Sequence, residues 1–257
     1  MNQETVAGSD LKEIEEFLGG LGIDGRHSRR LLYWVYRRGI RSFEEINDIP
    51  LKFLRVLSEN AVPGLSLPIA SEVSSDGSVK YLFTTKNGMA HETVFLPDGK
   101  RRTVCVSVQS GCRMGCRFCA TGKNGWNGNL TAGEIVNQVI SIPHEITHIV
   151  MMGMGEPGDN IDEVIRACRI LTAGWGLAAG RSRVTVSTVG VTPSVRRLLD
   201  ETECNITLSL HSPFPEERLT VIPAEARWPF AATLDMLKQY DNRIKRRFTV
   251  AYVMIEG

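Results

Sequence analysis

Residues 105–122 read CVSVQSGCRMGCRFCATG and contain four of the six cysteines in this 257-residue chain. Three of them, Cys112, Cys116 and Cys119, follow an apolar segment with the spacing C-x3-C-x2-C. Thiolates bind soft metals, and this spacing allows one short loop to surround one metal centre. Because a cube of four irons takes four ligands, three cysteines leave one iron open. The count therefore predicts a reactive iron–sulfur centre rather than a structural one.

A structural zinc site is the alternative interpretation of these cysteines, with a histidine such as His91 or His144 as the fourth ligand. Structural zinc sites usually show paired C-x2-C units or a series of cysteines and histidines, so the sequence favours iron and sulfur. Arg113, Arg117 and Lys123 lie in or beside the loop, where they can offset the negative charge of a cluster.

Around this loop the chain alternates predicted strands and helical patterns, which is typical of parallel βαβ units. Helix starts are predicted at Thr131 and Asn160, each followed three residues later by a glutamate, and at Thr192 before Pro193. The predicted strands are Thr103–Gln109, His148–Gly155, Arg183–Gly190, Asn205–His211 and Arg247–Ile255. Ligands gather at the carboxyl ends of such strands, where this sequence places polar residues and glycines.

Residues 1–98 are predicted to form a separate accessory domain of helices followed by β-hairpins. Asp10 with Glu13, and Ser42 with Glu45, have the spacing of a helix capping box. Alternating apolar residues between positions 69 and 95 are interrupted by two Asp-Gly or Asn-Gly turn signals, which predicts three short antiparallel strands. Residues 99–257 are predicted to form the catalytic core.

The accessory domain also carries a basic segment, residues 26–41, with six arginines and no acidic residue. A solvated helix face and a contact with an RNA backbone are both consistent with that charge of +6. The whole chain is nearly neutral, because 30 Lys and Arg residues face 29 Asp and Glu residues. Any nucleic-acid site must therefore be a local patch.

The overall composition excludes several classes of protein. Hydrophobic residues make up 42% of the chain and charged residues 23%, which is typical of globular domains and excludes wholesale disorder. No apolar run reaches the roughly 18 residues of a membrane helix. The acidic N-terminal segment is unlike a signal peptide, so a cytoplasmic location without a membrane partner is expected.

Seven separated segments resemble, in the same order, the RlmN/Cfr family of radical SAM RNA methyltransferases, and RlmN most closely. They are DGSVKYLF (76–83), HETVFLP (91–97), CVSVQSGCRMGCRFCATG (105–122), NLTAGEIVNQV (129–139), VMMGMGEP (150–157), VTVSTVGV (184–191) and LSLHSP (208–213). The resemblance runs from about residue 30 to the end of the chain. It implies an α/β fold, a partial (β/α) radical SAM barrel without its sixth strand.

The resemblance also implies a cofactor set and its ligands. A [4Fe-4S] cluster would be held by Cys112, Cys116 and Cys119, and its open iron would bind S-adenosyl-L-methionine (SAM). Further contacts with SAM are implied for Gly155, Glu156, Ser187, Ser209, Leu210 and His211.

Two further residues match catalytic positions of the family. Cys105 matches a cysteine that forms a transient covalent link, and Glu92 matches a glutamate assigned as a proton acceptor. Without the resemblance, Cys105 would be a small buried apolar residue and Glu92 a carboxylate on a strand surface. Cys168 and Cys204 match no family role and are expected to be packing residues.

The implied activity is methylation of adenosine carbon 2 in 23S rRNA, at the peptidyl-transferase centre, and in tRNA, with an external electron donor. That carbon is electrophilic and carries an unactivated C–H bond, so radical chemistry suits it better than polar methyl transfer. Three alternatives remain open: Cfr-type methylation of carbon 8, a radical SAM enzyme with another substrate, and a non-catalytic metal-containing RNA-binding protein.

The end of the chain departs from the family pattern. In the family, a cysteine beyond a sixth strand carries the methyl group, and an asparagine there contacts SAM. Here no cysteine follows Cys204 and the chain ends at Gly257, which leaves the edge of the last strand unpaired. We therefore expect a fragment or an inactive form that binds the cluster and does not complete methyl transfer.

Overall fold

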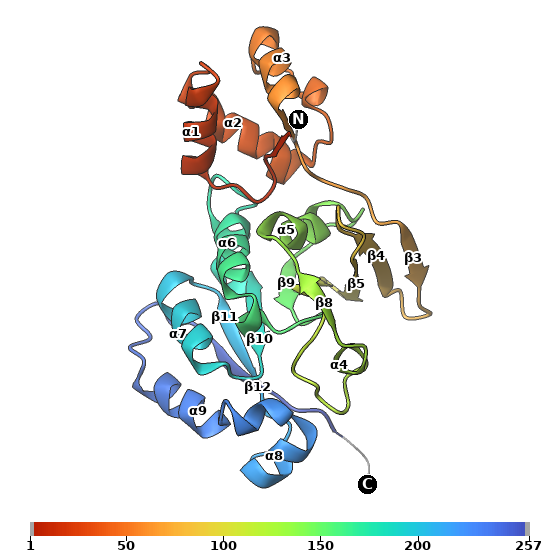
Figure 1. The fold of residues 1–257 in the computed structure, drawn as a ribbon, viewed down its shortest axis with the longest axis vertical. Coiled ribbons are helices and arrows are strands. Elements are labelled where there is room, and N and C mark those ends of the chain that lie inside the picture. The colour runs from red at the N-terminus through yellow and green to blue at the C-terminus, as the bar shows by residue number, and fades with distance from the viewer. Residues whose placement is uncertain (1–2, 255–257) are drawn as a thin grey trace.

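The computed structural model describes residues 3–254, and its centre is one eight-stranded sheet in the order β12-β11-β10-β9-β6-β5-β4-β3 (Figure 1). Five neighbouring strands of this sheet run parallel. They are β6 (Arg101–Cys105), β9 (His148–Met151), β10 (Val184–Thr188), β11 (Asn205–Ser209) and β12 (Phe248–Ala251). Because the strands follow one another in sequence order, the sheet winds as part of a barrel. The predicted fold class is confirmed.

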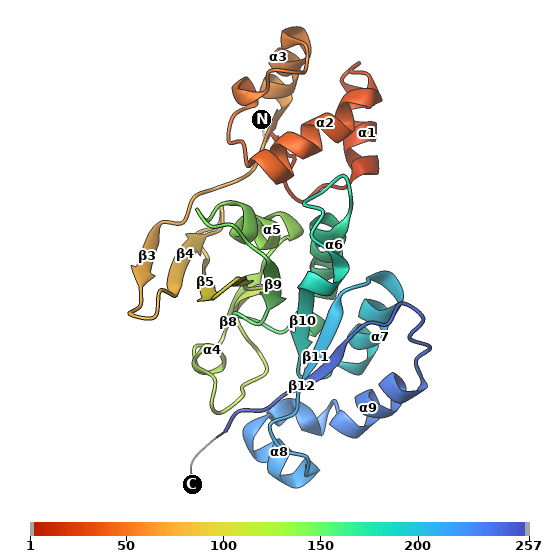
Figure 2. The ribbon, with the colours of Figure 1, turned by 180° about the vertical axis from the view of Figure 1, so that it is seen from behind.

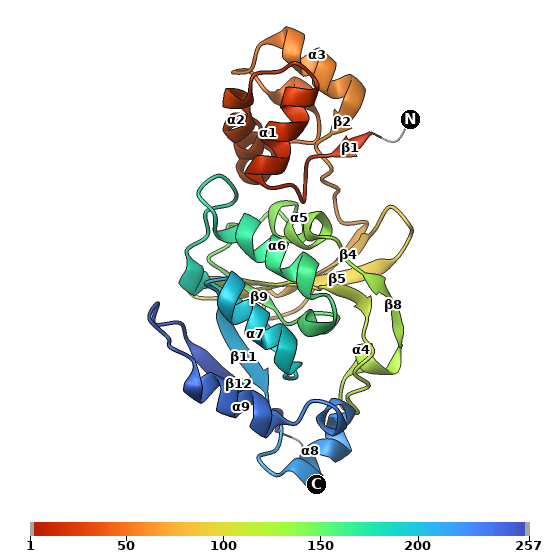
Figure 3. The ribbon, with the colours of Figure 1, turned by 60° about the vertical axis from the view of Figure 1, so that its left-hand side comes forward.

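Four helices follow these strands and cover the outer face of the sheet: α5 (Ala132–Ile140), α6 (Ile161–Thr172), α7 (Thr192–Glu201) and α9 (Phe230–Gln239). Figure 3 shows the first three side by side along that face. Alternation along each strand explains the packing, since Val184 and Val186 of β10 are buried while Thr185 and Ser187 are partly exposed. The outer face is therefore core, and the inner face is free to form a site.

Two of the predicted helix starts differ in their hydrogen bonds. Thr131 caps α5 with Glu134 in a complete capping box, as predicted. Asn160 makes no cap to α6, and its amide donates to the carbonyls of Val108 and Leu130, both at 2.8 Å. The predicted helix start at Asn160 is confirmed, since α6 begins at the next residue, but the side chain of Asn160 bonds to two buried carbonyls instead of capping the helix.

The predicted strands were too long at their carboxyl ends. Residues 103–109 form two strands, β6 and then β7 (Gln109–Gly111), which pairs with β8 (Trp126–Asn129). The break occurs where Val108 and Gln109 both donate to the carbonyl of Met154, which bends the chain away from the ladder. The predicted end of the last strand, Ile255, lies outside the described residues.

The N-terminal region lies at the amino end of the parallel strands (Figure 1, Figure 2). It contains β1 (Glu4–Thr5), α1 (Leu11–Gly20), α2 (Ser28–Tyr33), a π turn (Trp34–Arg38), α3 (Leu51–Asn60) and β2 (Ala61–Val62), with 3-10 turns at Gly25–His27 and Phe43–Glu45. The Asp10 capping box opens α1 as predicted. The Ser42 box opens only the second 3-10 turn, because Pro50 starts α3 separately.

Three antiparallel strands connect the two regions: β3 (Ala70–Val73), β4 (Val79–Thr84) and β5 (Ala90–Asp98). Their turns have left-handed glycines, Gly77 and Gly88, as the Asp-Gly and Asn-Gly signals predicted. β5 pairs with β6, so these strands extend the main sheet. A domain boundary between residues 98 and 99 stays a prediction.

The carboxyl ends of the parallel strands carry short elements: α4 (Ala120–Lys123), α8 (Pro215–Val221), and 3-10 turns at Pro157–Asp159 and Pro223–Ala226. A further 3-10 turn, Arg181–Arg183, precedes β10 at the other end. Among the helices within residues 3–254, none has the length and apolar character that crossing a membrane requires.

Candidate active site

The three clustered cysteines lie on one loop that leaves the sheet after β7 and returns at β8. The β7–β8 pair closes the base of this loop, with the amide of Cys112 donating to the carbonyl of Gly125 at 2.8 Å. Gly111 has φ +84° and would place a Cβ 2.0 Å from that same carbonyl oxygen, so only glycine fits here. The loop therefore presents Cys112, Cys116 and Cys119 from a fixed base.

All six cysteines of the chain are free thiols. Burial raises the pKa of both Cys112 and Cys116 to about 11, and the neighbouring cysteine thiolates and the Glu156 carboxylate add to the rise. Negative charge on Cys119 and on Glu156 thus reaches both Cys112 and Cys116, so ionising the loop cysteines together is unfavourable. A bound metal cation would offset the negative charge of the thiolates, which is how metals deprotonate clustered thiols.

Glu156 follows β9 and is a buried carboxylate, 3% exposed. It accepts hydrogen bonds from the amides of Gly158 at 2.8 Å and Val189 at 2.9 Å, and from the hydroxyl of Thr188. Burial raises the pKa of Glu156 above its ordinary value, and these three donors oppose that rise. The carboxylate therefore ties the end of β9 to the end of β10.

A second network joins the cysteine loop to the same strand end. Gln109 is fully buried. Its side-chain carbonyl accepts from the main-chain amide of Glu156 at 2.9 Å. Its side-chain NH2 group donates to the side chains of Asn129 at 2.7 Å and Asp159 at 3.1 Å. Arg113 lies 3.8 Å from Asp159, and its guanidinium is 3.5 Å from the centre of the Trp126 ring. Arg113 is thus engaged with protein groups beside the first cysteine.

The ends of β10 and β11 hold the other residues that the resemblance assigned to SAM. Ser187 points to the inner face of the sheet, whereas its neighbour Thr188 bonds to Glu156. Ser209 ends β11, and His211 follows with a left-handed backbone, φ 55°. The His211 ring contacts Phe118 of the cysteine loop edge-on, with centroids 4.7 Å apart.

The segment containing α8 supports the cysteine loop from below (Figure 3). Ile222 packs with Cys116 in a small apolar cluster, and Met114 and Trp228 lie against it. The amide of Arg117 donates to the carbonyl of Val221 at 2.9 Å. The loop is therefore fixed at its base by β8 and at its tip by α8.

Glu92 and Cys105 lie on the inner face of the sheet. Cys105 is paired with Val94, two residues from Glu92 on the same face of β5. Burial raises the pKa of Cys105 to about 11, so the resting thiol is protonated. Glu92 is half-exposed and lies 3.5 Å from the ammonium group of Lys80 on β4. The structure thus places the two residues on neighbouring strands that face the same space.

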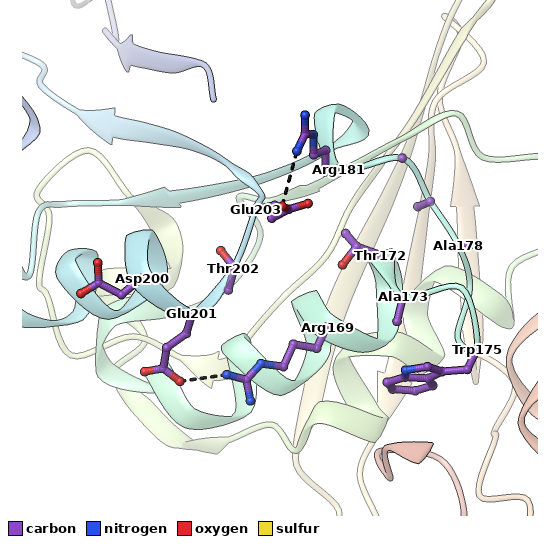
Figure 4. A pocket seen from close by; sticks show the side chains of 12 residues that line it. Arg169, Thr172, Ala173, Trp175, Ala178, Arg181, Asp200, Glu201, Thr202 and Glu203 are labelled. Atoms are coloured by element: carbon purple, nitrogen blue, oxygen red, sulfur yellow. Dashed lines mark hydrogen bonds and ion pairs between the residues drawn. The ribbon is translucent and has the colours of Figure 1, made fainter. Parts of the chain in front are cut away.

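A large cavity lies elsewhere, at the amino ends of the strands (Figure 4). It measures about 810 Å³ and is lined by residues of α6, α7 and the turns that follow them. Two ion pairs cross it, Arg169–Glu201 at 3.1 Å and Arg181–Glu203 at 3.4 Å. Its charged groups neutralise one another in solvent, and no residue that the sequence singled out lines it.

Comparison with known proteins identifies the family of the chain. The Radical SAM superfamily matches residues 106–257. Proteins named probable dual-specificity RNA methyltransferase RlmN, from Bacteroides thetaiotaomicron and Porphyromonas gingivalis (strain W83), are 38% and 41% identical to the chain. These matches cover 100% and 98% of the chain, and 75% and 74% of those proteins. The chain belongs to the RlmN family of radical SAM enzymes.

A solved structure agrees with this RlmN assignment. A radical SAM methyltransferase from Sphaerobacter thermophilus superimposes with a TM-score of 0.90 at 35% identity, over 99% of this chain and 77% of that one. The dual-specificity RNA methyltransferase RlmN of Geobacter sulfurreducens is 38% identical over 98% of the chain and 71% of its own length. The predicted family is confirmed.

The residues present fit the cluster of a radical SAM enzyme. Within residues 3–254, no three Cys, His, Asp or Glu side chains converge to hold a single metal ion. Each thiolate of an iron–sulfur cube binds a different iron, so three cysteines around a loop need not meet at one point. His91 stacks on Phe83, and His144 stacks on Phe95, so neither histidine supports the zinc alternative.

Several residues that organise this site were not among the predicted site residues. Gln109 and Thr188 hold Glu156, Asn160 holds the loop before α5, and Arg218 with Glu225 forms a buried ion pair below the cysteine loop. Gln109 and Thr188 stand at the polar ends of predicted strands and Asn160 at a predicted helix start, and these were the available signals. No local spacing identifies Arg218 and Glu225.

Proposed function

We propose that this chain binds a [4Fe-4S] cluster through Cys112, Cys116 and Cys119 and binds SAM at the neighbouring strand ends, in order to methylate RNA. The observation that carries the proposal is the convergence of the cysteine loop with the ends of β9, β10 and β11. The Phe118–His211 contact and the Glu156 hydrogen bonds join these segments directly. When bound, the cluster and SAM would supply one-electron chemistry and the methyl group.

The SAM-facing residues would orient the cofactor. Gly155 has φ +101°, and a Cβ there would lie 2.6 Å from Gln109, so the strand end passes close to the cysteine loop without a side chain in the way. Glu156 fixes the amides of Gly158 and Val189, which keeps this rim in one conformation. Ser187, Ser209, Leu210 and His211 complete the predicted set on the neighbouring strand ends.

Cys105 and Glu92 would act on the substrate base from the inner face. A thiol that burial keeps protonated becomes a nucleophile when a nearby base accepts its proton. The Glu92 carboxylate lies 3.5 Å from the ammonium group of Lys80, which holds it at the inner face of the sheet. We infer that the Cys105 thiol forms a transient covalent link as it resolves the adduct between protein and RNA, and that Glu92 is a proton acceptor in this reaction.

The proposed substrates are adenosines of 23S rRNA and of tRNA, methylated at carbon 2. The relatives are named dual-specificity RNA methyltransferases, and the exposed arginines of residues 26–41 offer a phosphate-binding surface. Free thiols and an oxygen-sensitive cluster suit a reducing, cytoplasmic compartment, with an external electron donor.

The test is anaerobic reconstitution followed by three measurements. Iron and sulfide should be bound, SAM should yield 5′-deoxyadenosine under a strong reductant, and nucleoside analysis of RNA should identify 2-methyladenosine. Finding 8-methyladenosine would favour the Cfr-type alternative, and a colourless zinc protein would overturn the proposal.

A further inference from the structure

Arg218 is a buried arginine on α8 that contacts two strand ends at once. Its side chain is 1% exposed, and its Nε donates to the carbonyl of Leu210 at 3.0 Å. Its Nη2 donates to the carbonyls of Ser209 at 2.9 Å and Val189 at 2.7 Å. Its Nη1 pairs with the carboxylate of Glu225. The guanidinium thus bonds to three main-chain carbonyls and one acid.

Glu225 completes this buried group from the opposite side. It is 6% exposed and also accepts a hydrogen bond from the amide of Phe230, the first residue of α9, at 3.0 Å. The Phe230 ring lies 5.2 Å from the guanidinium carbon of Arg218 and excludes water. A buried ion pair of this kind contributes little net stability, and its usual benefit is a defined geometry.

Val189 is held at both of its main-chain polar groups. Its N–H donates to Glu156 at 2.9 Å and its C=O accepts from Arg218. Val189, the residue that follows β10, is therefore held between Glu156, which follows β9, and Arg218, which also bonds to the end of β11. The separation of these three strand ends depends on both charged groups.

The β11 end depends on Arg218 in a second way. The carbonyls of Ser209 and Leu210 are fixed just before His211, whose left-handed backbone is rare for a residue with a side chain. Such a conformation persists only when the surroundings hold it. The His211 ring then reaches Phe118 in the cysteine loop.

The same helix supports the cysteine loop directly. The carbonyl of Arg218 accepts from the amide of Ile222 at 2.7 Å, and Ile222 packs on Cys116. The next link is the bond from the amide of Arg117 to the carbonyl of Val221. Arg218 therefore connects the loop that carries the cysteines with the strand ends that carry the SAM-facing residues.

We propose that Arg218, held by Glu225, is a positioning residue that sets the cysteine loop and the ends of β10 and β11 at the separation that SAM requires to reach the cluster. This inference rests on the proposed function. Arg218 itself bonds only to protein groups and acts through Val189, Ser209 and Leu210. Its removal should change how SAM is held more than whether the cluster is bound.

The experiment compares Arg218→Met, Arg218→Lys and the double variant Arg218→Met/Glu225→Leu with wild type after anaerobic reconstitution. The double variant removes both buried charges together, so it retains folding where a single loss leaves Glu225 unpaired. Arg246→Met is the matched control, since Arg246 is also buried and donates to carbonyls of Leu198 and Leu199 at the other end of the sheet.

Three readouts separate positioning from stability. We expect Arg218→Met and the double variant to keep their iron and to weaken the Kd for SAM about 10- to 100-fold, as supporting residues of metal sites do. The change that SAM causes in the electron paramagnetic resonance spectrum of the reduced cluster should shrink. Amide hydrogen exchange of residues 189–211 should accelerate in the protein without cofactors. Arg218→Lys should recover part of each effect.

The controls distinguish the outcomes. Arg246→Met should lower the unfolding midpoint and leave the Kd for SAM unchanged. If the double variant and Arg218→Lys bind SAM as wild type does, with the same spectral change, the positioning role is overturned while the proposed function stands. If wild type itself takes up no cluster or binds no SAM, the proposed function fails instead.

Discussion

The carboxyl and amino ends of the parallel sheet both carry charged side chains, but these side chains have different partners. At the carboxyl end, Glu156 and Arg218 are buried and bond to main-chain groups of neighbouring loops. At the amino end, Arg169 and Arg181 pair with glutamates on the wall of an open cavity (Figure 4), and the buried Arg246 donates only to carbonyls at the end of α7 and just after it. Exposed ion pairs contribute about 0–1 kcal/mol each, whereas buried groups bonded to the backbone fix its geometry.

This difference shows that the partners of the charged side chains identify the end of the sheet at which the candidate site lies. The cavity of about 810 Å³ lies at the amino end, and Ala178 on its wall also has a left-handed backbone, φ 56°. The carboxyl end has His211 with φ 55°, Gly155 with φ +101° and Gly111 with φ +84°. Positive φ values therefore occur at both ends, and what distinguishes the carboxyl end is that Glu156 and Arg218 each join different strand ends beside the cysteine loop.

The largest expected effect is loss of the cluster. Replacing Cys116 by serine removes one of three thiolates, so the iron and sulfide bound after reconstitution should fall to near zero. Cys168→Ser is the control, because Cys168 is a buried thiol of α6. It should keep the metal content of wild type. Equal iron in the two variants would contradict the role of the cysteine loop.

The next largest effect is on the free energy of unfolding, when one glutamate at each end of the sheet is replaced by glutamine. In Glu156→Gln, the new NH2 group must face an amide donor, either Gly158 or Val189, so a buried donor is left without an acceptor. We expect the free energy of unfolding to fall by about 3 kcal/mol, measured in urea. Glu201→Gln weakens two partly exposed pairs, with Arg169 and Arg197, and should cost less than about 1 kcal/mol for each pair. Similar losses would mean that the two ends do not differ.

The pH dependence of the free energy of unfolding tests the burial of His91 on β5, the strand that pairs with the strand of Cys105. Burial lowers the pKa of His91 from 6.5 to about 4, so the unfolded chain binds the proton more tightly than the folded protein. Stability from this residue is present above pH 6.5 and is lost as the pH falls toward 4. Between pH 7.5 and pH 5, wild type should lose about 2 kcal/mol through His91.

His91→Phe should remove that contribution. The variant and wild type are compared by urea unfolding at both pH values, with pH 7.5 as the internal control for any change in packing against Phe83. The same pH dependence in the two proteins would show that His91 is not the group responsible. The test uses the protein before reconstitution, so that loss of the cluster in acid does not contribute.

The smallest effect concerns RNA binding at the amino end. The structure changes the sequence interpretation of the arginine segment, because Arg37 donates to the carbonyls of Gly174 and Gly176 and Arg30 pairs with Asp48. Arg29 and Arg38 remain exposed. Arg29→Gln/Arg38→Gln should reduce the slope of log binding constant against log salt by about 1 for each lost phosphate contact.

Arg37→Gln is the control for this comparison. It removes hydrogen bonds to the loop after α6, so it should lower stability and leave the salt slope close to that of wild type. Binding of a 23S rRNA fragment is measured over a range of salt concentrations. An unchanged slope in the double variant would remove these arginines from the RNA surface.

Much of the fold could be predicted because its signals are local. The Asp10 and Thr131 capping boxes, the left-handed glycines of the two hairpins and the alternation of the five parallel strands with helices all follow from residues close together in the chain. Asn160 shows the limit of that reasoning. Its spacing to Glu163 is that of a cap, but its amide bonds to carbonyls of Val108 and Leu130 instead.

The candidate site could be predicted only in part. The cysteine spacing and the family motifs identified the segments, and the structure places those segments at one end of the sheet. Gln109 and Thr188, which help to hold them together, were predicted only as polar strand ends, and Arg218 and Glu225 had no local signal. Each bonds to a group that approaches only after the strands have paired and the helices have packed.

By itself, the sequence determined the alternation of strands and helices, the loop with three thiols and the family, because these depend on residue type and short spacing. The tertiary structure alone decided that Glu92 and Cys105 share one face, and that Arg218 lies between the carbonyls of Val189 and Ser209. The physical reason is that burial and long-range hydrogen bonds depend on register and packing, which local spacing does not encode.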